Sequence, residues 1–232
     1  MNLKYRHELK FVITDLEYRE LQPVLCAMMD RDSHAEQDGH YNIRSLYFDD
    51  MYRTAYVQKM DGVENRKKYR IRIYNCEDRS ISLECKYKRG AYIRKEAVRL
   101  TREEYAKMLN LDYTFLLRKE QQVAKEFFVD ARTNRLRPWV IVEYDREPFI
   151  NDVGTVRITF DKNVRAISPE ENMFFEEVPS FSVLPPGKMI LEIKFTEILP
   201  EKIRRLFRKY SFVQTNASKF CLCADKLGEV MR

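Results

Sequence analysis

The stretch K-K-Y-R-I-R-I-Y, residues 67–74, alternates charged and apolar side chains through most of its length. Its cations Lys68, Arg70 and Arg72 share one face of an extended chain, and the apolar residues share the other. An alternation of period two is typical of a β-strand with two different faces. Arginine is a costly residue for a plain wet surface, but its planar guanidinium suits two-pronged binding of phosphate.

The same alternation recurs along the chain, where charged faces carry the patterns R-x-R, E-x-K or E-x-K-x-K. We predict strands at Tyr5–Ile13, Tyr41–Phe48, Lys67–Tyr74, Ile81–Lys88, Ile93–Leu100, Trp139–Phe149, Thr155–Asp161 and Met189–Phe195.

Helical patterns separate these strands. We predict helices at Thr14–Met29, Thr101–Met108, Tyr113–Phe127, Pro200–Tyr210 and Ser218–Val230. The first two begin with a capping-box pattern, in which a threonine is followed three residues later by a glutamate. Pro185-Pro186 predicts that 179–187 is an ordered loop.

An antiparallel sheet with one wet face would explain any single strand. Taken together, the strands favour an α+β fold with a closed antiparallel barrel of about eight strands and helices packed outside it. The helices would cover the apolar faces, so that the charged faces point inward. A lumen of cations needs water or a bound anion, and phosphates would supply the counter-charge. Glutamates among the cations leave room for a divalent metal.

Length and composition narrow the function further. The chain has 232 residues and shows no linker, so we expect a single domain over residues 1–232. Its net charge of +6 favours anionic partners. No G-x-G-x-x-G or P-loop pattern occurs. The five cysteines are odd in number and lack a C-x-x-C pair, which fits a cytoplasmic protein. We expect no secretory signal and no membrane span, since no apolar run approaches ~20 residues.

In motif order, the chain resembles the triphosphate tunnel metalloenzyme, or CYTH-like, superfamily, and within it the VTC-domain polyphosphate polymerases. The resemblance covers about residues 5–225. Its motifs are R-H-E-L-K-F at Arg6–Phe11, R-S-L-Y-F-D at Arg44–Asp49, Y-R-I-R-I-Y at Tyr69–Tyr74, L-E-C-K-Y-K at Leu83–Lys88, R-K-E-A-V-R at Arg94–Arg99, E-Y-D-R-E-P-F at Glu143–Phe149, V-R-I-T-F-D at Val156–Asp161, L-E-I-K-F at Leu191–Phe195 and S-K-F at Ser218–Phe220.

The resemblance implies a metal-dependent phosphotransferase that moves the γ-phosphoryl group of ATP onto a growing inorganic polyphosphate chain in a cationic tunnel. It implies that the catalytic residues are Lys10, Arg70, Arg72, Lys86, Arg146, Arg157 and Lys219. It implies further substrate-binding residues at Lys88, Lys95, Tyr144, Lys194 and Ser218. Glu192 would hold Mn²⁺ or Mg²⁺, directly or through water. Glu8 and Glu84 would be structural partners of neighbouring cations, outer-shell groups or metal ligands.

Other functions stay open at this point. The same tunnel could hydrolyse tripolyphosphate or a nucleoside triphosphate, or it could bind polyphosphate without turnover. The S-K-F ending makes an adenylate cyclase a poorer fit. Nucleic acid is not an expected partner, because no exposed aromatic platform is discernible. The expected partners are ATP and inorganic polyphosphate or pyrophosphate. The sequence leaves open the preferred metal, the oligomeric state and whether a separate membrane protein moves the product.

Overall fold

A computed structural model describes residues 6–32, 39–90, 92–151, 156–196, 198–215 and 218–230. The chain is of the α+β class, with a large antiparallel sheet and six α-helices among those residues. It forms two compact units. Unit 1 comprises Met1–Asn42, Tyr144–Val164 and Leu184–Ala217, and unit 2 comprises Ile43–Glu143, Arg165–Val183 and Ser218–Arg232. The single domain over residues 1–232 and the closed barrel both stay predictions.

The strands of unit 1 follow the order β1-β10-β8-β7, with the short β2 paired to β7. Their bounds are Arg6–Thr14 for β1, Asp30–Arg31 for β2, Arg137–Ile150 for β7, Val156–Ile167 for β8 and Lys188–Thr196 for β10. β7 and β8 run on into unit 2. Two of the predicted strands began at Tyr5 and Thr155, which lie outside the described residues.

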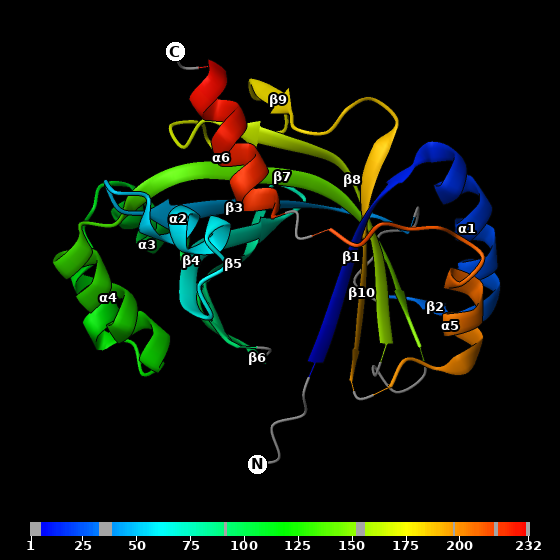
Figure 1. Ribbon diagram of the computed structural model, residues 1–232. Helices are drawn as coiled ribbons and strands as arrows, with labels where there is room; N and C mark the ends of the chain where they lie inside the picture. The colour runs from blue at the N-terminus through cyan, green and yellow to red at the C-terminus, as the bar shows by residue number, and fades with distance from the viewer. Residues whose placement is uncertain are drawn as a thin grey trace. The chain divides into compact units, whose positions relative to one another are not determined.

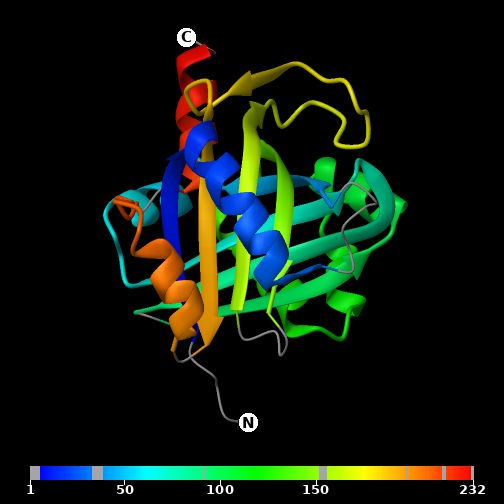
Figure 2. The ribbon, with the colours of Figure 1, turned by 90° about the vertical axis from the view of Figure 1, so that its right-hand side faces the viewer.

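Two helices cover one face of the unit 1 strands, α1 at Asp15–Met28 and α5 at Glu201–Phe207. Figure 2 shows α1 in blue and α5 in orange on the same side of these strands. Their buried residues join a core that includes Leu21, Leu25, Phe160, Leu191 and Ile203. The apolar half of each alternating strand therefore faces helices, as its sequence pattern predicts.

The predicted capping boxes are confirmed. Thr14 accepts a hydrogen bond from the amide of Glu17, whose carboxylate in turn accepts one from the Thr14 amide at 2.6 Å. Thr101 and Glu104 form the same box at the start of α3, Arg102–Leu109. Each box satisfies backbone donors that a helix start would otherwise leave without partners.

The strands of unit 2 follow the order β7-β3-β4-β5-β6. The bounds are Tyr41–Asp49 for β3, Asn65–Tyr74 for β4, Glu77–Arg89 for β5 and Tyr92–Leu100 for β6. Figure 1 labels these strands, together with the short β9 at Ser180–Ser182, which pairs with the last residues of β8.

The apolar face of the unit 2 strands is covered by α3, the 3₁₀ helix η1 at Thr114–Arg118, and α4 at Gln122–Asn134. Phe127 of α4 lies at the centre, with its ring 5.1 Å from that of Phe48 and 5.0 Å from that of Tyr69. A different helix, α6 at Lys219–Val230, contacts the opposite, polar face, because the ring of its Phe220 lies 4.9 Å from that of Tyr47.

Three local predictions were wrong or incomplete. The single helix over Tyr113–Phe127 is two elements, η1 and α4, separated at 119–121. The loop at 179–187 contains β9. The helix α2, Thr54–Met60, was not foreseen, because it buries no residue and so has no apolar stripe. Its start is satisfied instead by the Asp49 and Asp50 carboxylates, which accept hydrogen bonds from the backbone amides of Tyr52, Thr54, Ala55 and Tyr56.

Candidate functional site

The polar face of unit 2 carries a row of cations whose positions follow from strand register. Arg70 lies opposite Tyr47 on β3 and opposite Glu84 on β5. One step along, Lys86 of β5 lies opposite Lys68 of β4 and Lys95 of β6. Residues directly opposite each other share a face, so the R-x-R and E-x-K patterns of separate strands converge on one surface.

The buried carboxylate of Glu84 binds two cations of this row. Its Oε2 accepts hydrogen bonds from Arg70 Nε at 2.8 Å and Nη2 at 2.6 Å, and its Oε1 accepts one from Lys95 Nζ at 2.9 Å. Burial raises the Glu84 pKa, but Arg70, Arg72 and Lys95 outweigh it and lower the pKa to about 2. The carboxylate is therefore charged at neutral pH and orients Arg70, as expected for a cation partner.

The remaining predicted residues of unit 2 surround this centre. The Arg72 Nε donates to the Ser45 hydroxyl at 3.2 Å. The buried Ser218, next to the start of α6, lies 3.5 Å from Lys68 Nζ through its hydroxyl. Lys219 is the first residue of α6, so the positive end of the helix dipole adds to the cations of this face.

Unit 1 carries a second cationic row, on the polar face of β1, β10 and β8. Lys10 lies opposite Glu192, while Lys194 lies between Glu8 on β1 and Arg157 on β8. Lys10 Nζ is 3.3 Å from Glu8 and 3.5 Å from Glu192, and Lys194 Nζ is 2.8 Å from Glu192. Burial and the neighbouring Arg146 outweigh the attraction of the two glutamates and lower the Lys194 pKa to about 8.

Arg146 is the most buried cation beside this row and is 7% exposed. Its Nε and Nη2 donate to the two carboxylate oxygens of Asp161 at 2.6 and 2.7 Å, and Nη2 also reaches Glu192 at 3.4 Å. Burial opposes the charge, but Asp161, Tyr144 and Glu192 hold the Arg146 pKa well above its ordinary value. The guanidinium also lies 5.1 Å from the centre of the Tyr144 ring.

Arg157 is hydrogen-bonded to residues outside β1, β10 and β8. Its Nη2 donates to the buried carboxylate of Asp32 at 2.7 Å and to the Tyr41 hydroxyl at 2.8 Å. Asp32 follows the short strand β2, so a segment far away in sequence fixes this arginine.

The predicted site residues thus fall into two groups. Unit 2 brings together Arg70, Arg72, Lys86, Lys88, Lys95, Ser218 and Lys219. Unit 1 brings together Lys10, Tyr144, Arg146, Arg157, Glu192 and Lys194. The sequence placed Lys68 on the same face as Arg70 and Arg72 without assigning it a role in the site. It did not single out Tyr47, Asp32 or Asp161 as site residues. Asp161 and Tyr47 lie inside the V-R-I-T-F-D and R-S-L-Y-F-D motifs, which was the available signal.

Glu192 is the residue expected to hold a metal. Among the described residues, no three His, Cys, Asp or Glu side chains are grouped so as to hold an ion by themselves. Mg²⁺ is commonly bound by one or two carboxylates together with substrate phosphates and water. Glu192 is buried and ion-paired with Lys10 and Lys194, so a metal there would need most of its ligands from phosphates or water. The metal role of Glu192 stays a prediction.

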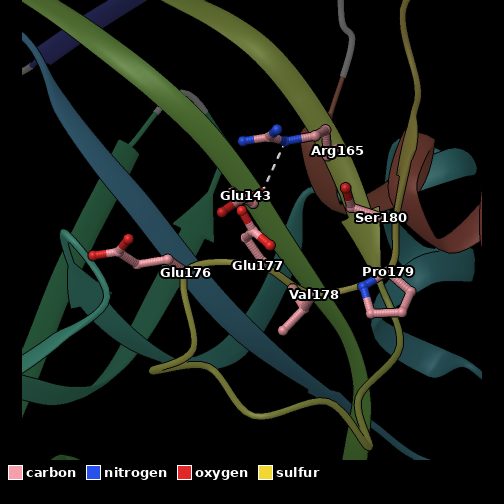
Figure 3. A pocket seen from close by; sticks show the side chains of 7 residues that line it. All are labelled: Glu143, Arg165, Glu176, Glu177, Val178, Pro179 and Ser180. Carbon is pink, nitrogen blue, oxygen red and sulfur yellow. Dashed lines mark ion pairs between the residues drawn. The ribbon is translucent and has the colours of Figure 1, made fainter.

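A cavity of about 430 Å³ lies elsewhere in unit 2 and is lined by Glu143, Arg165, Glu176, Glu177, Val178, Pro179 and Ser180. Figure 3 shows the carboxylates of Glu143, Glu176 and Glu177 around it. Glu143 is already paired with Arg44 at 2.7 Å and Arg165 at 2.8 Å. The residues that line this cavity include more carboxylates than cations, so the cavity is unsuited to phosphate. None of the predicted site residues lines it.

Among the helices of the described ranges, none is long and apolar enough to cross a membrane.

Comparisons with known proteins were made for the whole chain. The sequence pattern of the VTC domain matches residues 5–227. No curated protein matches the chain significantly. Among solved structures, a protein of Bacillus halodurans named as a "putative adenylate cyclase" is 12% identical, with a TM-score of 0.55 and coverage of 93% of each chain. A Pyrococcus horikoshii protein is 16% identical with a TM-score of 0.49, covering 96% of this chain and 99% of its own. At 12% identity, the likeness to the Bacillus halodurans protein concerns the fold alone.

Proposed function

The chain belongs to the VTC domain family, and from that premise we propose that it is a polyphosphate polymerase, transferring the γ-phosphoryl group of ATP to a growing inorganic polyphosphate chain. The observation that carries the proposal is the pair of cationic rows, in which arginines and lysines are held in register by buried carboxylates. Such rows suit a ligand with many phosphates in line.

We propose further that the strands close into a barrel of about eight strands with a cationic interior, as the family fold implies. Two observations support this within the units. In unit 1, α1 and α5 cover the apolar face. In unit 2, α3, η1 and α4 do the same. A structure with bound tripolyphosphate tests the idea, since phosphates that contact none of the predicted cations would contradict it.

Phosphoryl transfer requires from the protein mainly in-line positioning and neutralisation of the negative charge on the transferred group. Arg70 and Arg146 are oriented by Glu84 and by Asp161, so little rearrangement is needed when phosphate arrives. The acceptor is already an oxyanion, so no strong general base is required. A divalent metal held by Glu192 and the phosphates would stabilise charge on the transferred group and on the leaving ADP.

The deciding experiment incubates purified protein with ATP, Mn²⁺ and a short pyrophosphate primer, and resolves the products by chain length on a gel. We expect a ladder of long chains and release of ADP. Free phosphate without chains would instead assign hydrolysis, and binding without any turnover would assign a polyphosphate-binding module. Arg70→Ala is the loss-of-function variant. Arg79→Ala is the matched control, because Arg79 is an arginine of β5 with a side chain 83% exposed.

A cytoplasmic location remains part of the proposal. The cysteines Cys26, Cys76, Cys85, Cys221 and Cys223 are all free thiols in the structure. Free thiols of this kind suit a reducing compartment.

A further inference from the structure

Tyr47 lies within the cationic row of unit 2, and the proposed polymerase function gives it no role so far. It is a residue of β3 directly opposite Arg70 of β4, and it is only 6% exposed. Its hydroxyl accepts a hydrogen bond from Arg70 Nη1 at 2.9 Å. Its ring packs against Phe220 of α6 at 4.9 Å. The phenol is therefore fixed from two sides, with its oxygen turned toward an arginine.

The arginine that Tyr47 contacts is held from both neighbouring strands. Glu84 of β5 accepts hydrogen bonds from Arg70 Nε and Nη2, while the Tyr47 hydroxyl of β3 accepts one from Nη1. A guanidinium is planar, so contacts at three of its nitrogens fix both its position and the direction of its plane. Glu84 contacts the Arg70 guanidinium only from the β5 side, and Tyr47 adds the contact from the β3 side. We call these three hydrogen bonds the clamp on Arg70.

The charges around Tyr47 are mostly positive. Arg70, Lys68 and Arg72 face it from β4, and Glu84, the nearby carboxylate, is itself shared with Arg70 and Lys95. Lys68 Nζ lies 5.7 Å from the centre of the Tyr47 ring. Burial raises the Tyr47 pKa, but Arg70, Lys68 and Arg72 outweigh burial and lower the pKa to about 7. The α6 side contributes the apolar ring of Phe220.

We propose that Tyr47 is a positioning residue that aims Arg70 at a bound phosphate, and that its phenolate oxygen takes up one proton as phosphates arrive. In the ligand-free protein the phenolate oxygen serves as a counter-charge to the cations. Bound phosphates take over that role and make a second negative charge beside them unfavourable. The phenolate then accepts a proton from solvent, and no other bond is made or broken. The inference rests on the proposed function, because phosphates are the anion it invokes.

The ligand-free protein gives the first test. The near-ultraviolet absorbance of tyrosinate should show one ionisation near pH 7 in the wild-type chain, and this step should be missing in Tyr47→Phe. Tyr52→Phe is the control, because Tyr52 is 78% exposed, and it should keep the step. A titration in which Tyr47→Phe and wild type coincide near pH 7 would overturn the charge state that we assign.

Calorimetry with tripolyphosphate gives the second test, run at about pH 8 in two buffers with different ionisation enthalpies. Wild type should take up between about half a proton and one proton more per bound ligand than Tyr47→Phe. The proton released by the ligand itself is common to both proteins and cancels. Tyr47→Phe should also bind about tenfold to a hundredfold more weakly near pH 7, which reflects loss of a hydrogen bond to a charged group.

Binding of tripolyphosphate separates the proposed function from the role of Tyr47. Wild-type protein that does not bind tripolyphosphate would refute the proposed function and, with it, the proton coupling. Binding by both proteins with equal affinity and equal proton uptake would leave the proposed function standing and overturn the role of Tyr47.

Discussion

Glu84→Gln is the substitution that most directly probes how the cationic rows are held. The structure places one buried carboxylate under Arg70 and Lys95, and the amide of glutamine keeps its shape while removing its charge. The cations lower the Glu84 pKa from 4.5 to about 2, although burial acts in the opposite direction. A shift of that size corresponds to about 3 kcal/mol of folding free energy at neutral pH.

The pH dependence carries the sign of the effect. Because the folded-state pKa lies below the ordinary value, the contribution of Glu84 is fully present above about pH 4.5 and is lost as the pH falls through about 2. We therefore expect Glu84→Gln to be less stable than wild type by about 3 kcal/mol at pH 7. The gap should narrow as the pH is lowered from 4.5 toward 2, because wild type alone loses this contribution.

Urea unfolding in phosphate-free buffer, followed by the fluorescence of the single tryptophan, Trp139, measures both expectations. Glu77→Gln is the control on the same strand, since its partner Arg79 is largely exposed and such pairs contribute little. If Glu84→Gln and wild type unfold at the same urea concentration at pH 7, or if their difference stays constant down to pH 2, the account of Glu84 as the anchor of this row is wrong.

Three further substitutions test other parts of the molecule. Arg70→Ala should reduce polymer synthesis by at least ~10²-fold with the fold retained, because it removes one electrostatic stabiliser, and wild-type yield on a gel would contradict this. Glu192→Ala should abolish the metal dependence of turnover, so an unchanged Mn²⁺ titration would exclude its proposed role. Phe127→Ala should lower the free energy of unfolding by about 3–5 kcal/mol through a cavity beside Phe48 and Tyr69, and a loss below ~1 kcal/mol in urea unfolding would show that the site collapses.

The cationic rows are not collections of isolated charges. Two of the arginines have a carboxylate partner, Glu84 for Arg70 and Asp161 for Arg146. Removing one partner of a buried pair is expensive, because it leaves a charge without compensation. The carboxylates thus allow the chain to fold with many cations on one face before any phosphate is bound, and they leave the arginines oriented.

Much of the fold could be predicted from the sequence because it is written in local patterns. Successive side chains of a strand point to opposite faces, so the alternation in 67–74 predicted both a strand and the side on which its arginines lie. The capping boxes at Thr14 and Thr101 were predictable for the same reason, since cap and partner are three residues apart. The helix α2 escaped prediction because its start depends on Asp49 and Asp50, and it has no apolar stripe.

The pairing of charged and polar side chains depends on the tertiary fold. Arg157 and Asp32 are 125 positions apart, and Tyr47 and Arg70 are 23 apart, yet each pair is in hydrogen-bond contact. These pairings depend on strand register and chain topology, which a residue's own neighbours in sequence do not specify. Local patterns of residues are enough to show that strands with one cationic face exist and to which family the chain belongs. The clamp on Arg70 and the environment of Tyr47 arise because folding brings β3, β4 and β5 side by side in one register.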